Sequence, residues 1–221
     1  MRHLVLITLA LAVLTRLAPA ATAATPGPWT LCADAVAAVE RTERMPGMLM
    51  HAVSLVESGR WSADQKATVA WPWTIYADGQ GKFFPTKAAA IDAVKKLRAR
   101  GIKVIDVGCM QVNLYHHPDA FPSLEAAFDP MTNAAYAARF LKQLRGKQGT
   151  WAYAVGQYHN SDWRARGQPY WRKVYALWNS EQRRLFDARR AERIRTNLAR
   201  MGRMPEYDPV HYSNVYITAG R

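Results

Sequence analysis

The sequence predicts a mainly helical α+β fold with one short strand-rich insert. Along most of the chain, apolar residues recur at steps of three or four, which is typical of helices that bury one face. Strand-like segments with turn signals are confined to residues 73–107. The chain has 221 residues, of which 49% are hydrophobic and 21% charged, so we expect one sizeable core and not a disordered chain.

Two helices are expected first, over residues 32–41 and 46–58. The second of them is apolar nearly all round over residues 48–56. A helix of this kind lies at the centre of a fold, because every face of it must be covered. It ends in Glu57-Ser58-Gly59.

The insert is expected to contain a β-hairpin, a helix and a third strand. Asp78-Gly79-Gln80-Gly81 connects the two strands of the hairpin. Pro85-Thr86 then begins a helix that ends at Gly101. The apolar stripe of this helix consists of Ile91, Val94 and Leu97. The expected strands are residues 73–77, 82–84 and 102–107.

Further helices complete the expected domain. They are residues 123–128, 131–145, 150–158 and a helix from Pro169 onward. In the second of these, Phe140, Leu141 and Leu144 are expected to face inward. The sequence contains no internal repeat and no low-complexity tract.

The first 23 residues are typical of an export signal. Arg2 and His3 precede an apolar run over residues 4–14, and small residues follow around Ala21-Thr22-Ala23. We predict cleavage after Ala23 and a periplasmic protein. The alternative, a membrane anchor, needs roughly 20 apolar residues, whereas this run has 11. A lipoprotein is not expected, because Leu31 stands before the first cysteine, where a small residue is needed.

The chain is strongly basic, with a formal net charge of +13. Cleavage after Ala23 would remove two arginines and no acid, which leaves +11. An exported protein of this charge meets anionic cell-wall polymer and lipid head groups before it meets nucleic acid. We therefore expect a cell-wall or membrane-surface partner and no nucleic acid.

The chain has two cysteines, Cys32 and Cys109. An oxidising compartment permits them to pair, so export predicts a disulfide. The alternative is two buried free thiols.

Glu57 is the first candidate for a catalytic residue. It follows the central apolar helix, where burial and the negative end of the helix dipole both disfavour its ionised form. A carboxyl group that keeps its proton to near-neutral pH is suited to general acid catalysis. The alternative is a helix-terminal glutamate that points into water.

Two further motifs carry candidate binding residues. In the segment from Asp106 to Asn113, the amides of Gln111 and Asn113 are two residues apart, so an extended chain would turn them the same way, toward the hydroxyl groups of a sugar. The alternative is a polar loop that satisfies its own backbone. The second motif places Tyr158 near the end of a helix, where a core tyrosine with a bonded hydroxyl is the ordinary alternative.

Taken together, these three motifs resemble the lytic transglycosylases with a soluble-lytic-transglycosylase domain, a family with the goose-type lysozyme fold. The resemblance covers about residues 32–177. Glu57-Ser58 matches the family's Glu-Ser pair, and Gly108-Cys109-Met110-Gln111 matches Gly-Leu-Met-Gln. Val112-Asn113 matches the Ile-Asn that follows, and Tyr158 matches the tyrosine of Ala-Tyr-Asn. Residues that depart from the family pattern are Cys109 for leucine, Gln157 for alanine and His159 for asparagine.

The resemblance implies a lysozyme-like domain over residues 24–180 that cleaves the β-1,4 bond between N-acetylmuramic acid and N-acetylglucosamine without water. Glu57 would act as general acid and then as base, and Tyr158 would stabilise positive charge on the sugar. No metal or other cofactor is implied, and the protein is expected to be a monomer that binds peptidoglycan strands. The implied substrate-binding residues are Ser58, Met110, Gln111, Asn113 and His159.

Three alternative functions remain at the level of sequence. A hydrolytic muramidase would need a second acid, for which Asp106 is the nearest candidate. A glycan-binding component of a secretion or flagellar apparatus would keep the cleft but not depend on catalysis. A metal enzyme would rest on His116, His117 and Asp119, whose spacing does not match common ligand patterns.

Residues 181–221 are expected to form a basic amphipathic helix and a tail. Eight arginines lie between Glu181 and Arg203, and apolar residues recur there at steps of three or four. Such a helix either packs on the domain with its arginines in solvent, or contacts an anionic membrane surface or a partner protein. The recurring apolar residues are Leu185, Ala188, Ala191, Ile194, Leu198 and Met201.

Overall fold

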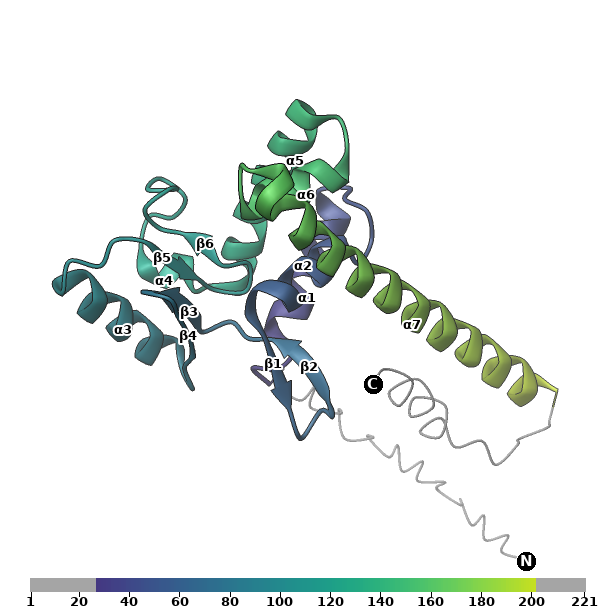
Figure 1. Cartoon of the computed structure of the whole chain (residues 1–221). Coiled ribbons are helices and arrows are strands. Elements are labelled where there is room, and N and C mark those ends of the chain that lie inside the picture. Colours follow the sequence, from purple (N-terminus) through teal and green to yellow (C-terminus); the bar gives the residue numbers. More distant parts are fainter. Residues whose placement is uncertain (1–26, 202–221) are drawn as a thin grey trace, which may run out of the picture.

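The computed structural model describes residues 27–201 and is mainly helical, with small antiparallel sheets (Figure 1). Helix α1 packs on α2 and α5, α5 packs on α6, and α7 packs on α2 and α6. The helices are α1 (Leu31–Thr42), α2 (Leu49–Ser58), α3 (Lys87–Ala99), α4 (Leu124–Ala127), α5 (Pro130–Gln148), α6 (Trp151–His159), the π-helical turn η1 (Trp163–Gly167) and α7 (Gln168–Arg200). The expected mainly helical α+β class is confirmed.

The strands form two separate antiparallel sheets. β1 (Gly59–Ser62) pairs with β2 (Ala67–Ala70), and this hairpin was not expected from the sequence. The second sheet has the order β4-β3-β5-β6, from β3 (Thr74–Ala77), β4 (Gln80–Phe83), β5 (Ile105–Val107) and β6 (Val112–Asn113). The expected hairpin of β3 and β4 is confirmed. Its connection is shorter than expected, because only Asp78 and Gly79 lie between the paired strands, and both residues have positive φ.

The buried apolar residues form two hydrophobic clusters, one around the central helix and one at the second sheet. The larger one surrounds α2, where Leu49, Met50 and Val53 are completely buried, so the prediction of a central helix is confirmed. The smaller one lies between the second sheet and α3, α4. Its buried members include Ile75, Ile91, Val94, Ile105 and Phe128.

Most expected helices are present, and their bounds differ for local reasons. α2 begins at Leu49 and not at residue 46, because Met48 has a left-handed backbone conformation with φ +66°. The buried carboxylate of Glu40 accepts hydrogen bonds from the N–H groups of Met48 and Met50 at 2.8 and 2.6 Å. An anion at this end of a helix satisfies its unpaired donors. In α5, Leu141 and Leu144 face inward as expected, and Phe140 is half-buried.

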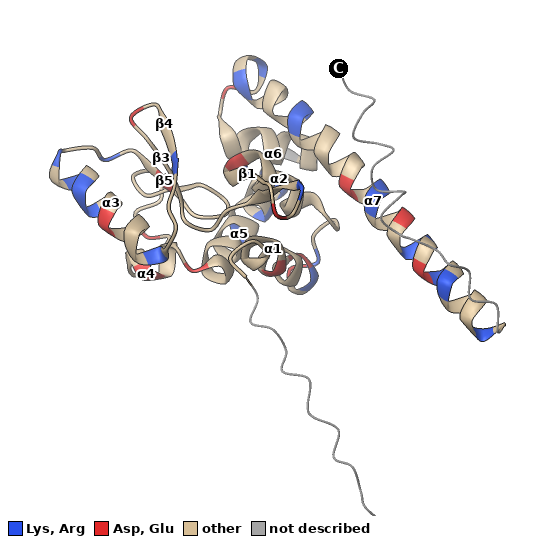
Figure 2. Cartoon of the chain, turned by 90° about the horizontal axis from the view of Figure 1, so that it is seen from below, with Lys and Arg blue, Asp and Glu red and all other residues tan. Residues whose placement is uncertain are grey.

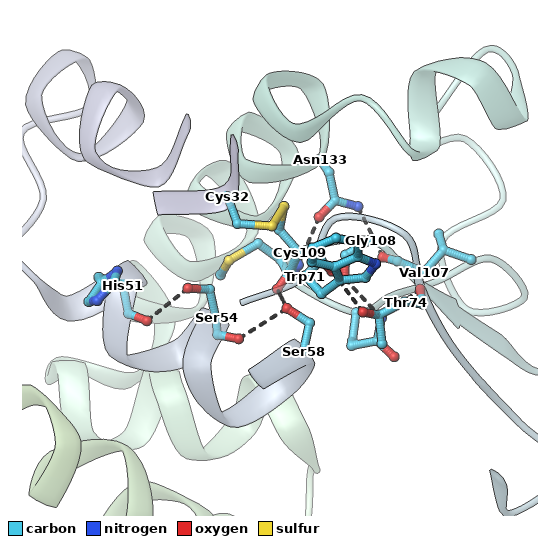
Figure 3. The surroundings of a disulfide bond; sticks show 12 residues. Cys32, His51, Ser54, Ser58, Trp71, Thr74, Val107, Gly108, Cys109 and Asn133 are labelled. Atoms are coloured by element: carbon cyan, nitrogen blue, oxygen red, sulfur yellow. Dashed lines mark hydrogen bonds between the residues drawn. A yellow bond between two sulfur atoms is a disulfide. The ribbon is translucent and has the colours of Figure 1, made fainter. Parts of the chain in front are cut away.

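The expected disulfide between Cys32 and Cys109 is confirmed. Both cysteines are completely buried, and their Cα atoms lie 5.6 Å apart. The bond joins the first turn of α1 to the turn that precedes β6, 77 residues later in the chain (Figure 3). It therefore connects the helical part of the molecule to the segment that carries the second sequence motif.

The basic segment after Glu181 is the outer half of α7 and not a separate helix. The inner half packs on the domain, where Tyr170 and Val174 are buried and the Trp178 indole N–H donates to the carbonyl of Gly47 at 2.9 Å. The outer half projects away from the other elements, with basic and acidic positions along it (Figures 1 and 2). On this half Phe186 is 61% exposed.

Two expectations concern residues that the structure does not describe. The export signal over residues 1–23 and the tail after residue 201 lie outside the described range. Within residues 27–201, no helix is both long and apolar enough to cross a membrane.

Candidate active site

Glu57 lies in the last turn of α2, where the chain turns sharply into β1. The turn requires glycine at position 59, because a Cβ on Gly59 would lie 2.1 Å from the carbonyl oxygen of Leu55. The Glu57 side chain is half-buried and lines a pocket of about 390 Å³. A ligand in that pocket can reach a carboxyl group that bulk water solvates poorly.

The pKa of Glu57 is raised from 4.5 to about 7. Burial is the main cause, and the negative charge of Asp106 adds to it, whereas a hydrogen bond from Tyr170 lowers the pKa. The expectation of a raised pKa is confirmed, with Asp106 as an additional cause. At neutral pH both the acid and the carboxylate form of Glu57 are populated, which suits a group that gives and then takes a proton.

Tyr170 is the residue of the site that the sequence analysis missed. Its hydroxyl donates to Glu57 Oε1 at 2.5 Å, and its ring stacks on His159 with 4.4 Å between the centroids. The bond to Oε1 leaves Oε2 as the oxygen that carries the transferable proton. The sequence indicated only that a helix begins at Pro169. It did not indicate that the first turn of this helix, α7, contacts the end of α2.

Tyr158 lies near Glu57. The charge of Glu57 contributes to raising the pKa of Tyr158 well above its ordinary value, after burial as the main cause. The Tyr158 hydroxyl donates to the carbonyl oxygen of Met110 at 2.7 Å. The fold thus brings residues from all three sequence motifs together, and the phenol oxygen keeps lone pairs for a positively charged neighbour.

The turn from Gly108 to Met110 is held by the completely buried Asn133. Its Oδ1 accepts from the Met110 N–H at 2.9 Å, and its Nδ2 donates to the carbonyl of Val107 at 3.0 Å (Figure 3). Gly108 has φ +82°, and a Cβ there would lie 2.5 Å from Asn133 Nδ2. Both observations require glycine at this position.

Two of the expected glycan-binding side chains point into the protein. Ser58 is 1% exposed, and its hydroxyl lies 2.8 Å from the carbonyl oxygen of Cys109. Met110 is completely buried. Ser58 therefore ties the end of α2 to the turn before β6, and Met110 contributes its carbonyl group to Tyr158 and not its side chain to a ligand.

The two expected amides bond mainly within the protein. Gln111 has φ +46°, so the segment is not extended there, and its Nε2 donates to the carbonyls of Thr74 and Gly108 at 3.1 and 2.9 Å. Asn113 donates to Asp106 Oδ1 at 2.7 Å from the neighbouring strand. The alternative reading, a polar loop whose side chains hydrogen-bond within the protein, therefore fits both amides.

The histidines offer no metal site within the described part of the chain. No group of three or more potential ligands comes together among residues 27–201. His117 shares a hydrogen bond of 2.8 Å with the hydroxyl of Tyr136. His159 lines the pocket beside Glu57, where burial and the charges of Lys173 and Arg166 lower its pKa and so favour its neutral form.

Replacing Tyr170 by phenylalanine is expected to raise the pKa of Glu57 above 7, because the hydrogen bond from the hydroxyl stabilises the carboxylate. NMR titration of the labelled Glu57 side-chain carboxyl carbon measures this pKa directly. Tyr175→Phe, at an exposed position of the same helix, is the matched control and should leave the titration unchanged. An unchanged or lower pKa in Tyr170→Phe would contradict the assigned role.

Taken together, the site contains one protonatable carboxyl group, a tyrosine bonded to it and a second tyrosine nearby, at the edge of a pocket. This arrangement can protonate a leaving-group oxygen and stabilise positive charge. Comparison of the chain with protein-family models, with curated proteins and with solved structures found no match.

Proposed function

We propose that this chain is a lytic transglycosylase of lysozyme-like fold that cleaves the β-1,4 bond between N-acetylmuramic acid and N-acetylglucosamine in peptidoglycan. The observation that carries the proposal is the single carboxyl group of Glu57, with a pKa of about 7 at the edge of a pocket. Peptidoglycan lies outside the cytoplasmic membrane, so this function goes together with export by the signal over residues 1–23.

In the first step, Glu57 donates the proton on Oε2 to the glycosidic oxygen of the leaving N-acetylglucosamine. The bond from C1 of the muramoyl residue to that oxygen breaks, and positive charge develops on the sugar ring. The Tyr170 hydroxyl, bonded to Oε1, stabilises the carboxylate that remains. The Tyr158 oxygen, whose own proton is donated to Met110, faces the developing positive charge in this mechanism.

In the second step, the Glu57 carboxylate accepts the proton of the muramoyl C6 hydroxyl. The freed oxygen attacks C1 and closes a 1,6-anhydro ring, so no water is consumed. Glu57 recovers its proton and is ready for another cycle. A pKa near neutrality serves both steps, because the same group must be a competent acid and then a competent base.

The surroundings of Asp106 also favour a mechanism with one carboxyl group. A hydrolase would use a second acid as base or nucleophile, and Asp106 is the acid whose charge acts on Glu57. Its Oδ1 is already bonded to the amide of Asn113, its neighbour on the next strand. In our proposal Asp106 supports the strand end and raises the pKa of Glu57, and the substrate supplies the nucleophile.

The test is to digest purified cell-wall sacculi with the protein and to identify the new muramoyl ends by mass spectrometry in H₂¹⁸O. We expect 1,6-anhydro ends without incorporated ¹⁸O, and none with Glu57→Gln. Reducing muramoyl ends that contain ¹⁸O would show hydrolysis and overturn the proposal. Binding to sacculi without cleavage would favour the role as a glycan-binding assembly component.

A further inference from the structure

The pocket beside Glu57 has a basic wall that the proposed reaction does not use. Arg166 and Lys173 line it, and Glu57 is the one acid among its lining residues. Within residues 27–201, neither cation forms an ion pair with an aspartate or glutamate, unlike the arginines farther along α7 that pair with Glu181 and Glu192. Two positive charges therefore line the pocket of Glu57, and neither is paired with an acid in the described part of the chain.

Part of the basic wall is built on a capped and closely packed turn. Arg166 belongs to the π-helical turn η1, and such turns are frequent at functional sites. The turn packs closely on α6, since a Cβ on Gly156 would lie 2.4 Å from the ring of Trp163. Asp162 caps the turn by accepting from the Ala165 N–H at 3.0 Å.

Lys173 belongs to the first turns of α7, which follows directly after η1. It lies three residues after Tyr170, so both side chains fall on the same side of the helix. Tyr170 holds the Glu57 carboxyl group. Lys173 thus lies about one helical turn from the tyrosine that bonds Glu57.

The charges already act on their neighbours inside the pocket. Both cations help lower the pKa of His159, whose ring lies against Tyr170. Two cations and one acid, Glu57, are among the lining residues, so the pocket has an excess of positive charge. An anionic group entering it would gain charge-assisted hydrogen bonds from both side chains.

We propose that Arg166 and Lys173 bind a carboxylate on the lactyl-peptide substituent of the muramoyl residue. This inference rests on the proposed function, since it places the muramoyl sugar at Glu57. The substituent is attached to the sugar whose C1 reacts, so its carboxylates enter the pocket that Glu57, Arg166 and Lys173 line together. The carboxylate belongs either to the peptide stem or, where the stem has been removed, to the lactyl group itself.

Steady-state cleavage of three glycans tests the proposal. They are strands with peptide stems, strands stripped by an amidase, which expose the lactyl carboxylate, and stripped oligomers whose lactyl carboxyl group has been converted to an amide, which keep the muramoyl bond but have no carboxylate. Arg166→Gln and Lys173→Gln are each expected to raise KM about tenfold, with kcat little changed, on strands that present the bound carboxylate. A loss confined to strands with stems assigns the stem, and a loss on stripped strands assigns the lactyl group. The oligomers should be unaffected.

Arg164→Gln and Arg172→Gln are matched controls, because both arginines are exposed neighbours that do not line the pocket. Equal losses in the controls, equal losses on the uncharged oligomers, or no loss at all would overturn the inference while leaving the proposed function intact. If the parent protein cleaves no glycan, the proposed function fails. In that case, calorimetry of N-acetylmuramoyl dipeptide binding tests the carboxylate site by itself. Weaker binding by Arg166→Gln than by Arg164→Gln would support the inference. Equal binding by the two variants, or no binding, would overturn it.

Discussion

Glu57→Gln is expected to lower the rate of glycan cleavage by about 10³-fold while making the folded protein more stable above pH 7. Glutamine has the same shape and keeps an oxygen that can accept the hydrogen bond of Tyr170. It cannot donate a proton to the glycosidic oxygen or remove one from the C6 hydroxyl. The chemistry should therefore be lost with little change to the fold.

The gain in stability follows from the sign of the pKa change. The pKa of Glu57 is about 7 in the folded chain against an ordinary value of 4.5, so folding binds a proton between these pH values. The stability that this proton contributes is complete below pH 4.5 and is lost as the pH rises to 7. Since a tenfold change in acidity is worth about 1.4 kcal/mol, the penalty at pH 8 is about 3 kcal/mol. Glutamine does not ionise and avoids it.

Urea unfolding at pH 4 and pH 8, together with kcat on sacculi, measures both effects. The advantage of Glu57→Gln over the parent protein should appear at pH 8 and disappear at pH 4. Glu43→Gln is the matched control, because Glu43 pairs with Lys142 at 2.7 Å, and that partner lowers its pKa. The control should retain activity and gain nothing at pH 8. An inactive Glu57→Gln without added stability at pH 8 would place Glu57 in a well-solvated position, contrary to the site described above.

Local signals in the sequence were enough to predict most of the helices. Thr86, Ser123 and Thr150 each cap a helix by accepting a backbone N–H three residues later, at 3.2 to 3.3 Å. The turn Asp78-Gly79 marked the hairpin in the same way. These features depend on neighbours within four residues, and such interactions can be read from the order of side chains alone.

Features that depend on tertiary contacts were missed. The β1–β2 hairpin has short strands, and its exposed Trp61 gives no clear alternation of buried and exposed residues. The π-helical turn has no periodicity of its own. It depends on the close approach to Gly156, which lies on another helix.

The same distinction applies to the candidate site. Glu57 could be singled out because the apolar helix before it implied burial, and its raised pKa depends on that burial. Tyr170 could not be identified, because its role depends on α7 meeting the end of α2. The inward orientation of Met110 follows from a turn held by Asn133, whose place in the fold no local pattern indicated.

Loss of the disulfide is expected to lower the free energy of unfolding by about 4 kcal/mol, on the chain-entropy account of a cross-link that closes so long a loop. The double variant Cys32→Ala, Cys109→Ala removes it without introducing a buried polar group. Urea unfolding of this variant and of the parent protein, each with and without dithiothreitol, measures the effect. Reductant should destabilise the parent protein and leave the double variant unchanged.

The position of the bond makes its loss relevant to the site as well as to the core. Cys109 accepts the hydroxyl of Ser58 through its carbonyl oxygen, and the next residue, Met110, accepts that of Tyr158. Release of this turn would loosen the contact between α2 and the Tyr158 side of the site, so cleavage should fall in the double variant even where it remains folded. If stability fell but kcat did not, the hydrogen bonds of Asn133 would be sufficient to hold the turn. If neither changed, the cross-link would have no part in holding α1 against the turn before β6.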